Sequence, residues 1–273
     1  KEIMPELPEV ETIANGLDKR VAGDRIDSVW VGGKPEPLKS SAAEISAVLE
    51  GAEIKKLRRV GKHIVFDLGS GKSASSQQWI VHLGMTGTML VAPPEIETAK
   101  HTHLIAKLAS GRELRFVDPR RFGRLEVRQA GFSGPGAEPL NISVEDFAQL
   151  FHHSKAPIKA ALLNQKLLHG VGNIYADEAL FRAHIRPRRR ANTLTKSELR
   201  KLHAALQKVL HAAIAAGGSS ISDYVDADGE AGFFQIQHRA YGREGKPCLT
   251  CKTPIKKIVV GGRGTHYCPK CQK

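Results

Sequence analysis

The stretch GFSGPGAEP at Gly131–Pro139 divides the sequence into two parts of different character. Three glycines and two prolines among nine residues are typical of a turn-rich linker. The sequence before this linker predicts many short strands, and the sequence after it predicts helices. The linker therefore indicates an α+β protein of more than one domain.

Upstream of the linker, short apolar runs separated by turns predict a β-rich domain, either a sandwich or a barrel. The predicted strands are Ile26–Val31, Ile54–Val60, His63–Leu68, Trp79–Leu83, Leu104–Leu108, Leu114–Val117 and Leu125–Val127. Two helices are predicted in the same part, at Glu6–Leu17, where apolar residues recur at helical spacing, and at Ala42–Leu49.

Downstream of the linker, helical patterns dominate. Ser143 is a predicted N-cap for the helix that follows it, VEDFAQLF. Further helices are predicted at Ile158–Leu168, Ala176–Ala183 and Ser197–Ala216, and Gly217 and Gly218 end the last of them. The stretch Gly217–Phe234 is rich in Gly, Ser and Asp, and loops of this length are commonly functional lids or mobile connectors.

All four cysteines fall near the end of the chain, as Cys248-x2-Cys251 and Cys268-x2-Cys271 with sixteen residues between the pairs. Each pair can hold one side of a tetrahedral metal, and four thiolates favour zinc in a closed structural site. The alternative is four reduced cysteines without a metal. The spacing predicts a small zinc module with a β-hairpin between its two pairs.

The 273 residues include 41 Lys and Arg against 28 Asp and Glu, a formal net charge of +13. Residues 182–201 carry eight basic side chains against one acidic, and residues 235–273 carry nine against one. Such runs are often only a solvated face. Two of them in one half, one with a metal-site pattern, favour a surface for a polyanion such as nucleic acid.

No apolar run approaches the roughly 18–20 residues of a membrane span. The first residues, KEIMPELPEVE, also lack the apolar segment of a secretory signal. These features lead us to expect an intracellular protein.

The segment Met4-Pro5-Glu6 has a chemical interpretation. If translation starts at Met4 and Met4 is removed, Pro5 presents a secondary amine with the pKa of an α-amino group, about 7.7–8.0. Such an amine can attack a sugar C1′ and form an iminium adduct, with Glu6 to supply or take a proton. The simpler interpretation is that Pro5 and Pro8 only start a helix. If Lys1 to Met4 are retained, the acylated Pro5 cannot be the nucleophile.

Eight ordered blocks resemble the bacterial formamidopyrimidine-DNA glycosylase family, the 8-oxoguanine repair enzymes. The blocks are PELPEVET at Pro5–Thr12, RRVGKH at Arg58–His63, HLGMTG at His82–Gly87, KHTH at Lys100–His103, DPRRFG at Asp118–Gly123, GVGNIYADE at Gly170–Glu178, YGREGKPC at Tyr241–Cys248 and the four-cysteine module. The resemblance implies an α+β multidomain fold with an N-terminal β-sandwich and flanking helices, a helix–two-turn–helix domain and a C-terminal zinc-finger β-hairpin. The implied boundaries are a catalytic domain at 5–134, a linker at 135–141, a DNA-binding domain at 142–234 with a lesion-capping loop at 217–234, and the finger at 235–273.

The resemblance also implies roles for single residues. Pro5 is the expected Schiff-base nucleophile and Glu6 the acid that opens or protonates the sugar. Lys62 is the expected proton donor for β-elimination, and Arg263 the donor for δ-elimination and a phosphate ligand. The four cysteines, Cys248, Cys251, Cys268 and Cys271, are expected to hold one structural Zn²⁺.

A second group of residues is implied to contact DNA. Met85, Arg120 and Phe122 match the family's void-filling residues, which occupy the space left by a flipped nucleotide. The expected DNA-binding residues are His101, Arg120, Lys155 and Asn173, and the expected lesion-pocket residues are Lys159 and Glu178. Ser154 departs from the family, which often has a basic residue there, and this leaves one phosphate contact open.

The resemblance implies a bifunctional DNA glycosylase and AP lyase that removes oxidised purines, 8-oxoguanine and formamidopyrimidines, from double-stranded DNA. We expect a monomer in the bacterial cytoplasm, associated with the nucleoid through DNA. One alternative is an endonuclease VIII-type enzyme for oxidised pyrimidines, although PELPEV and the long loop favour the purine enzyme. The other alternative, if Lys1 to Met4 are retained, is an inactive protein that binds damaged DNA without cutting it.

Overall fold

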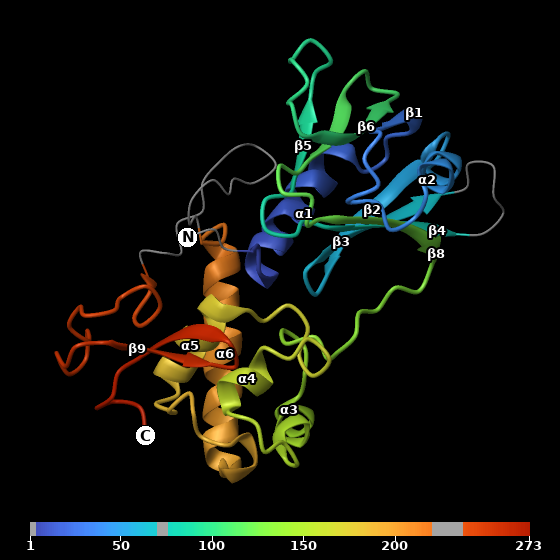
Figure 1. Ribbon diagram of the computed structural model, residues 1–273. Coiled ribbons are helices and arrows are strands. Elements are labelled where there is room, and N and C mark those ends of the chain that lie inside the picture. Colours follow the sequence, from blue (N-terminus) through green and yellow to red (C-terminus); the bar gives the residue numbers. More distant parts are fainter. Residues whose placement is uncertain (1–3, 70–75, 220–236) are drawn as a thin grey trace. The chain divides into compact units, whose positions relative to one another are not determined.

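The computed structural model describes residues 4–69, 76–219 and 237–273, and the chain forms two compact units (Figure 1). Unit 1 comprises residues 1–133 and 217–232, and unit 2 comprises residues 134–216 and 233–273. In the described part of the chain, no helix is both long enough and apolar enough to cross a membrane.

Unit 1 contains two four-stranded antiparallel sheets, and this selects the sandwich from the two β-rich architectures expected. One sheet has the order β1-β6-β7-β5 and the other the order β2-β3-β4-β8. The strands are β1 (Ile26–Val31), β2 (Glu53–Val60), β3 (His63–Gly69), β4 (Gln77–His82), β5 (Thr88–Ala92), β6 (Thr102–Leu108), β7 (Glu113–Val117) and β8 (Arg124–Gln129).

Two helices accompany the sheets. Helix α1 (Leu7–Val21) buries Val10, Ile13 and Leu17 in the core between strands of both sheets, as its helical apolar spacing predicts. Burial of side chains of this size contributes about 1.5–3 kcal/mol each. Helix α2 (Ala42–Leu49) begins at Ser41, whose hydroxyl accepts the N–H of Glu44 at 3.2 Å in a capping box.

The structure confirms the seven strands predicted from the sequence and adds β5. The run Thr88–Ala92 has no polar–apolar alternation and lies at the edge of its sheet, where it pairs only with β7. An edge strand with only one of its five residues buried carries little periodic signal, which explains why the prediction missed it.

Unit 2 is helical. It contains α3 (Val144–Phe151), α4 (Ile158–Leu162), α5 (Asn173–Arg182), the short 3-10 turn η1 (Ala191–Thr193), α6 (Lys196–Ala215) and the hairpin β9 (Lys256–Val260) with β10 (Arg263–Tyr267). Ser143 caps α3 as predicted, and its hydroxyl accepts the N–H of Asp146 at 3.0 Å.

The helix predicted at Ile158–Leu168 is wrong in its second half, because α4 ends at Leu162. The carboxamide oxygen of Asn164 accepts the N–H of Lys166 at 3.0 Å, and this local bond replaces a helical one. The prediction extended the helix through the apolar run and overlooked the turn that Asn164 favours.

The cysteine module is built into unit 2. The side chain of Gln272, which is fully buried, donates to the carbonyl of Ile185 at 2.9 Å. The backbone N–H of Lys273 donates to the carbonyl of His184 at 3.0 Å, and Lys273 accepts the N–H of Arg186 at 2.9 Å. The last residues of the chain therefore pair with the segment that follows α5.

Candidate functional site

The start of α1 places Pro5 and Glu6 next to each other, and both are buried. The carboxylate of Glu9 accepts the N–H of Glu6 at 2.9 Å and the N–H of Ser219 at 2.8 Å. Glu9 therefore fixes the backbone at Glu6 and at the segment that follows α6. The nitrogen of Pro5 is bonded to Met4 in this chain, so a nucleophilic amine forms only when the residues before Pro5 are removed.

Lys62 lies half-buried in the two-residue turn that joins β2 and β3. Arg59, near the end of β2, pairs with Glu11 of α1 at 2.5 Å and donates to the carbonyl of Gly61 at 3.1 Å. The Arg59 side chain is 5% exposed and that of Glu11 is 24% exposed, so this ion pair is partly shielded from water. The pair couples the turn that carries Lys62 to the helix whose start carries the expected nucleophile.

The residues expected to fill the void lie on two loops whose backbones touch. Met85 lies in the turn after β4, and Phe122 lies in the loop between β7 and β8. At Gly84, with φ of 65°, a Cβ atom would lie 2.5 Å from the carbonyl carbon of Phe122. The fully buried carboxylate of Asp118 accepts the hydroxyl of Thr86 at 2.5 Å and so ties the two loops together.

Arg120 and Phe122 form a pair on the surface of this loop. The guanidinium carbon of Arg120 lies 4.7 Å from the ring centroid of Phe122, which is 48% exposed. His101 is exposed, and its carbonyl accepts the N–H of Asp118 at 2.9 Å. The structure therefore brings His101, Arg120 and Phe122 together around Asp118.

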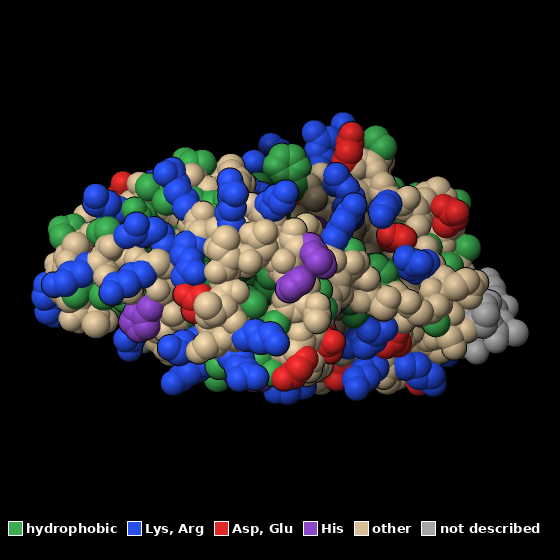
Figure 2. Space-filling model, turned by 90° about the horizontal axis from the view of Figure 1, so that it is seen from below, with side chains coloured by type: hydrophobic (Ala, Val, Ile, Leu, Met, Phe, Trp, Pro, Cys, Tyr) green, Lys and Arg blue, Asp and Glu red, His purple; other side chains and the backbone are tan. Residues whose placement is uncertain are grey.

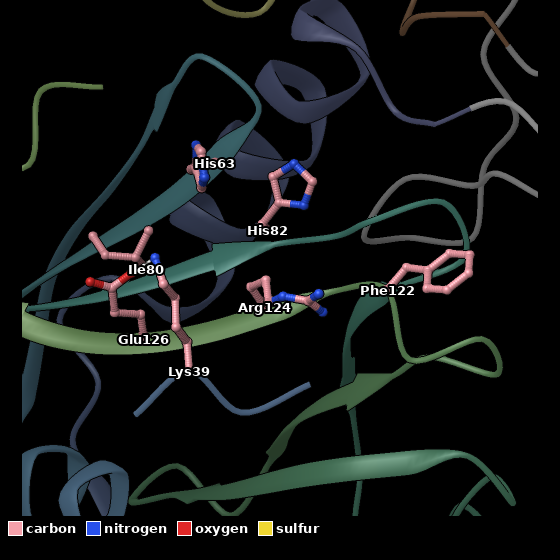
Figure 3. Close-up of a pocket in the computed structure, with 7 residues that line it drawn as sticks. All are labelled: Lys39, His63, Ile80, His82, Phe122, Arg124 and Glu126. Carbon is pink, nitrogen blue, oxygen red and sulfur yellow. Dashed lines mark ion pairs between the residues drawn. The ribbon is translucent and has the colours of Figure 1, made fainter. Parts of the chain in front are cut away.

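A pocket of about 340 Å³ opens beside Phe122 on the sheet β2-β3-β4-β8 (Figure 3). It is lined by Lys39, His63, Ile80, His82, Phe122, Arg124 and Glu126. Lys39 pairs with Glu126 at 3.2 Å, whereas Arg124 forms no ion pair with any described carboxylate. Figure 3 shows the guanidinium of Arg124 extending toward the Phe122 side of the pocket.

His82 supplies a neutral donor to this pocket. Burial, followed by repulsion from His63, Lys62 and Arg124, lowers the pKa of His82 from 6.5 to about 4. Its Nδ1 accepts the N–H of Gly84 at 3.1 Å, which leaves the proton of the neutral ring on Nε2. The pocket can therefore offer an anion N–H donors from an imidazole and a guanidinium.

In unit 2, the start of α5 contacts strand β10 close to the turn of the β9–β10 hairpin. Asn173, the first residue of α5, donates from Nδ2 to the carbonyl of Gly264 at 3.1 Å. The preceding residue, Arg263, has an exposed side chain without a carboxylate partner among the described residues. Gly261 and Gly262 form the turn with φ of 57° and 72°, as a tight hairpin requires. The start of α5 thus contacts β10 at the residue after Arg263, and a helix N-terminus favours anions.

Lys159 and Glu178 are both fully buried inside unit 2. The ammonium of Lys159 lies 2.6 Å from the carboxylate of Asp177. The carboxylate of Glu178 accepts the N–H groups of Ala240 and Tyr241 at 2.8 and 2.9 Å. Their place beside a damaged base remains a prediction, and the contacts seen here hold parts of unit 2 together. Lys155 and Ser154 lie in the loop before α4, where Lys155 is exposed.

The four cysteine sulfurs fit one zinc ion. They lie within 4.8 Å of one another, and two pairs are separated by 3.9 Å (Cys248 and Cys271) and 3.4 Å (Cys251 and Cys268). A tetrahedral zinc with Zn–S distances of about 2.3 Å separates its sulfurs by about 3.8 Å. Burial and the neighbouring sulfurs raise the pKa of Cys271, so four thiolates at this spacing need a cation. The zinc is structural, because four thiolates leave no open coordination position.

Charge separates the two units. Unit 1 contains 20 basic and 21 acidic side chains, whereas unit 2 contains 21 basic and 7 acidic ones. Figure 2 shows many Lys and Arg side chains on one face, with fewer Asp and Glu among them. Unit 2 therefore carries the electrostatic attraction for a polyanion.

Three family models match the chain. The Formamidopyrimidine-DNA glycosylase N-terminal domain matches residues 4–125, the Formamidopyrimidine-DNA glycosylase H2TH domain matches residues 134–225, and the zinc finger found in FPG and IleRS matches residues 245–273. The chain belongs to the formamidopyrimidine-DNA glycosylase family. Curated relatives with that name include the Solibacter usitatus protein, 44% identical, and the Listeria monocytogenes protein, 40% identical, each matching 99% of this chain and all of the relative.

Solved structures of the family are similar throughout. MutM (FPG) from Thermus thermophilus is 42% identical with a TM-score of 0.86, covering 98% of both chains. A Lactococcus lactis FPG variant in complex with Fapy-dG-containing DNA has a TM-score of 0.90 at 35% identity, over 98% of this chain and all of that one. A Lactococcus lactis Fpg complex with abasic-site DNA has a TM-score of 0.89 at 35% identity, over 98% of this chain and 99% of that one.

Sequence reasoning missed the residues that support the site. Glu9, Asp118 and Asp177 each lie inside a quoted block, yet their roles depend on partners far along the chain. Glu9 and Asp177 accept the backbone N–H groups of Ser219 and His266, and Asp118 accepts the hydroxyl of Thr86. His82 and Arg124 flank, in sequence, the residues expected to fill the void. One signal in the sequence could have indicated such a supporting residue. Glu9 lies on an otherwise apolar face of α1, and a buried carboxylate is rare unless it has a partner.

Proposed function

We propose that this chain is a bifunctional DNA glycosylase and AP lyase of base excision repair that acts on oxidised purines in double-stranded DNA. The observation that carries the proposal is the coupling inside unit 1 of the Pro5–Glu6 start of α1 to the turn of Lys62 through the Arg59–Glu11 pair. Family membership and the DNA complexes of the relatives support it.

The first step is attack on the sugar. The free amine of Pro5 attacks C1′, and the bond between C1′ and the base breaks with its electron pair on the base, which is protonated. Glu6 protonates the ring oxygen as the sugar opens, which gives an iminium between Pro5 and C1′. The side chain of Glu6 is 3% exposed and follows Pro5 directly in the chain, so the acid lies beside the reacting amine and away from bulk water.

Two eliminations follow from the iminium. Loss of a proton from C2′ forms a double bond and expels the 3′ phosphate, and a second proton loss expels the 5′ phosphate. Lys62 assists the first departure and Arg263 the second, each as a proton donor or charge partner for the leaving phosphate. Water then hydrolyses the iminium, which releases the sugar fragment and regenerates the amine of Pro5.

Met85, Arg120 and Phe122 fill the space left by the flipped nucleotide. A flipped base leaves a gap whose unstacking costs a few kcal/mol, and apolar side chains inserted into the stack offset part of that cost. Met85 and Phe122 project from loops that Asp118 holds together, while Arg120 can hydrogen-bond the base of the opposite strand.

Phosphate contacts come from both units. His101, Lys155, Asn173 and Arg263 serve this role, and the donors of His82 and Arg124 extend it to the pocket beside Phe122. Lys159 and Glu178 are assigned to the lesion side of unit 2.

The proposed domains follow the family. The catalytic domain spans 5–134, the linker 135–141, the DNA-binding domain with its loop 142–234 and the finger 235–273. The loop positions 220–234 lie outside the described residues. We assign a monomer in the cytoplasm, where it associates with the nucleoid.

Excision assays test the proposal and its rivals. Protein that begins at Pro5 is incubated with duplexes containing 8-oxoguanine opposite C or thymine glycol, and the cleaved strand is analysed. Faster cutting at 8-oxoguanine supports the purine enzyme, and faster cutting at thymine glycol supports the endonuclease VIII type. Tight binding of both duplexes without any cleavage would show an inactive binding protein.

A further inference from the structure

A buried ion pair in unit 2 takes no part in the chemistry assigned above. The ammonium of Lys159 and the carboxylate of Asp177 lie 2.6 Å apart, and both side chains are fully buried. Removing two charges from water is costly, and apolar residues would often serve stability equally well. Such a pair is expected where it fixes one particular arrangement of the chain.

What the pair holds is the backbone that follows Arg263. Lys159 donates to the carbonyl of Gly264 at 3.1 Å and to the hydroxyl of Thr265 at 2.8 Å. Asp177 accepts the N–H of His266 at 2.8 Å. The two buried charges therefore bind three successive residues of β10.

The hydroxyl of Thr265 extends this network to Arg263 itself, because it donates to the Arg263 carbonyl at 3.0 Å. On the other side of Arg263, Gly261 is seated so closely on α4 that an added Cβ would lie 3.0 Å from the Cβ of Ala160. The backbone of Arg263 is thus fixed from both sides, while its side chain is exposed.

We propose that Lys159 and Asp177 are positioning residues for Arg263, and that they act by fixing the β10 backbone from which its guanidinium reaches the DNA. The proposal rests on the lyase function above, in which Arg263 assists the second elimination. A guanidinium on a fixed backbone retains its geometry between one turnover and the next. Displacement of β10 then impairs δ-elimination while the reactions of Pro5, Glu6 and Lys62 continue.

The test separates the two eliminations. The Asp177→Asn protein, processed to Pro5 and loaded with zinc, is given an excess over a labelled duplex with one abasic site. We expect β-elimination within about 2-fold of the parent and δ-elimination slower by about 10- to 100-fold, as a displacement near 1 Å produces. The unsaturated aldehyde end then accumulates in place of the phosphate end.

A milder variant guards against loss of folding. Thr265→Val keeps the size of the side chain but removes the hydroxyl that joins Lys159 to the Arg263 carbonyl. We expect the same shift of products to a smaller degree, with zinc content and thermal unfolding close to the parent. His203→Ala is the matched control, because His203 bonds the carbonyl of Ile142 and makes no described contact with β10. Its product ratio should equal that of the parent.

A double variant shows whether the effect passes through Arg263. With Arg263→Lys in place, adding Asp177→Asn should slow δ-elimination no further, whereas an additional full loss overturns the proposal. Equal slowing of both eliminations in Asp177→Asn, or an unchanged product ratio, also overturns it. A parent protein that cuts no abasic DNA would instead contradict the lyase function itself.

Discussion

Units 1 and 2 differ in net charge and in the functional residues that each contains. Unit 1 is close to neutral, with 20 basic and 21 acidic side chains, and contains the residues proposed as the nucleophile, its acid and the void fillers. Unit 2 has 21 basic and 7 acidic side chains and contains the zinc module. Attraction to DNA and recognition of damage are therefore separate properties, and net charge reports only the first.

Both units nevertheless use buried carboxylates in the same way. In unit 1, Glu9 and Asp118 accept backbone N–H groups that fix the loops around the reacting groups. In unit 2, Asp177 and Glu178 fix the finger, and each also has a basic partner, Lys159 and Arg182.

The largest effect is expected from Glu6→Gln in unit 1. Loss of the acid should slow base release by about 10²- to 10⁴-fold, the usual contribution of general acid–base catalysis. DNA affinity and its salt dependence should stay at the parent values, because the charge of unit 2 is unchanged. Single-turnover excision and fluorescence anisotropy measure the two quantities. A large loss of DNA affinity in this variant would contradict the separation of catalysis in unit 1 from DNA attraction in unit 2.

Removal of zinc should lower DNA binding by unit 2. Without the metal, the hairpin that carries Arg263 loses its fold, and affinity for DNA should fall on the order of 100-fold with a shallower salt dependence. The far-ultraviolet circular dichroism of the β-sandwich should persist. Restoring zinc should recover binding, and unchanged affinity after verified metal removal would contradict the role assigned to unit 2.

Phe122→Ala tests the void-filling role in unit 1. We expect kcat/KM on 8-oxoguanine duplexes to fall by about 10- to 100-fold, since the side chain offsets part of the unstacking cost. Trp30→Ala is a matched control, because Trp30 is a similarly exposed aromatic residue of unit 1 at 51%. Equal losses in the two variants would remove the special role of Phe122.

The smallest expected effect is the pH dependence of the stability of unit 1. The pKa of His82 is lowered from 6.5 to about 4 in the fold, so unfolding takes up a proton between these values. The free energy of unfolding should be fully retained above pH 6.5 and fall as the pH drops to 4, by about 1–2 kcal/mol after allowance for partial exposure. Urea unfolding at several pH values should show a flatter dependence in His82→Gln. An identical dependence would contradict the neutral imidazole.

Most of the fold could be predicted because its signals are local. Strand alternation, the spacing of apolar residues in α1 and the Ser143 cap each depend on a few consecutive residues. Two elements were predicted wrongly, β5 and the end of α4. Strand β5 lies at a sheet edge, and α4 ends near a side-chain hydrogen bond of Asn164. These signals are weaker than the apolar patterns around them.

The candidate site could be predicted only in part. Family resemblance named Pro5, Lys62 and Arg263, and cysteine spacing alone predicted the zinc ligands. The supporting contacts could not be read from sequence, since Asp177 meets His266 across 89 residues and Glu9 meets Ser219 across 210. Such contacts depend on the tertiary fold and leave no local pattern.

Borohydride trapping shows directly whether Pro5 is the nucleophile. Protein processed to begin at Pro5 is mixed with an 8-oxoguanine:C duplex and borohydride, and the adduct is digested and located by mass spectrometry. We expect a covalent DNA adduct on the nitrogen of Pro5, and no adduct from protein that retains Lys1 to Met4. An adduct on a lysine, cutting by protein that retains Lys1, or no adduct from processed protein would contradict it.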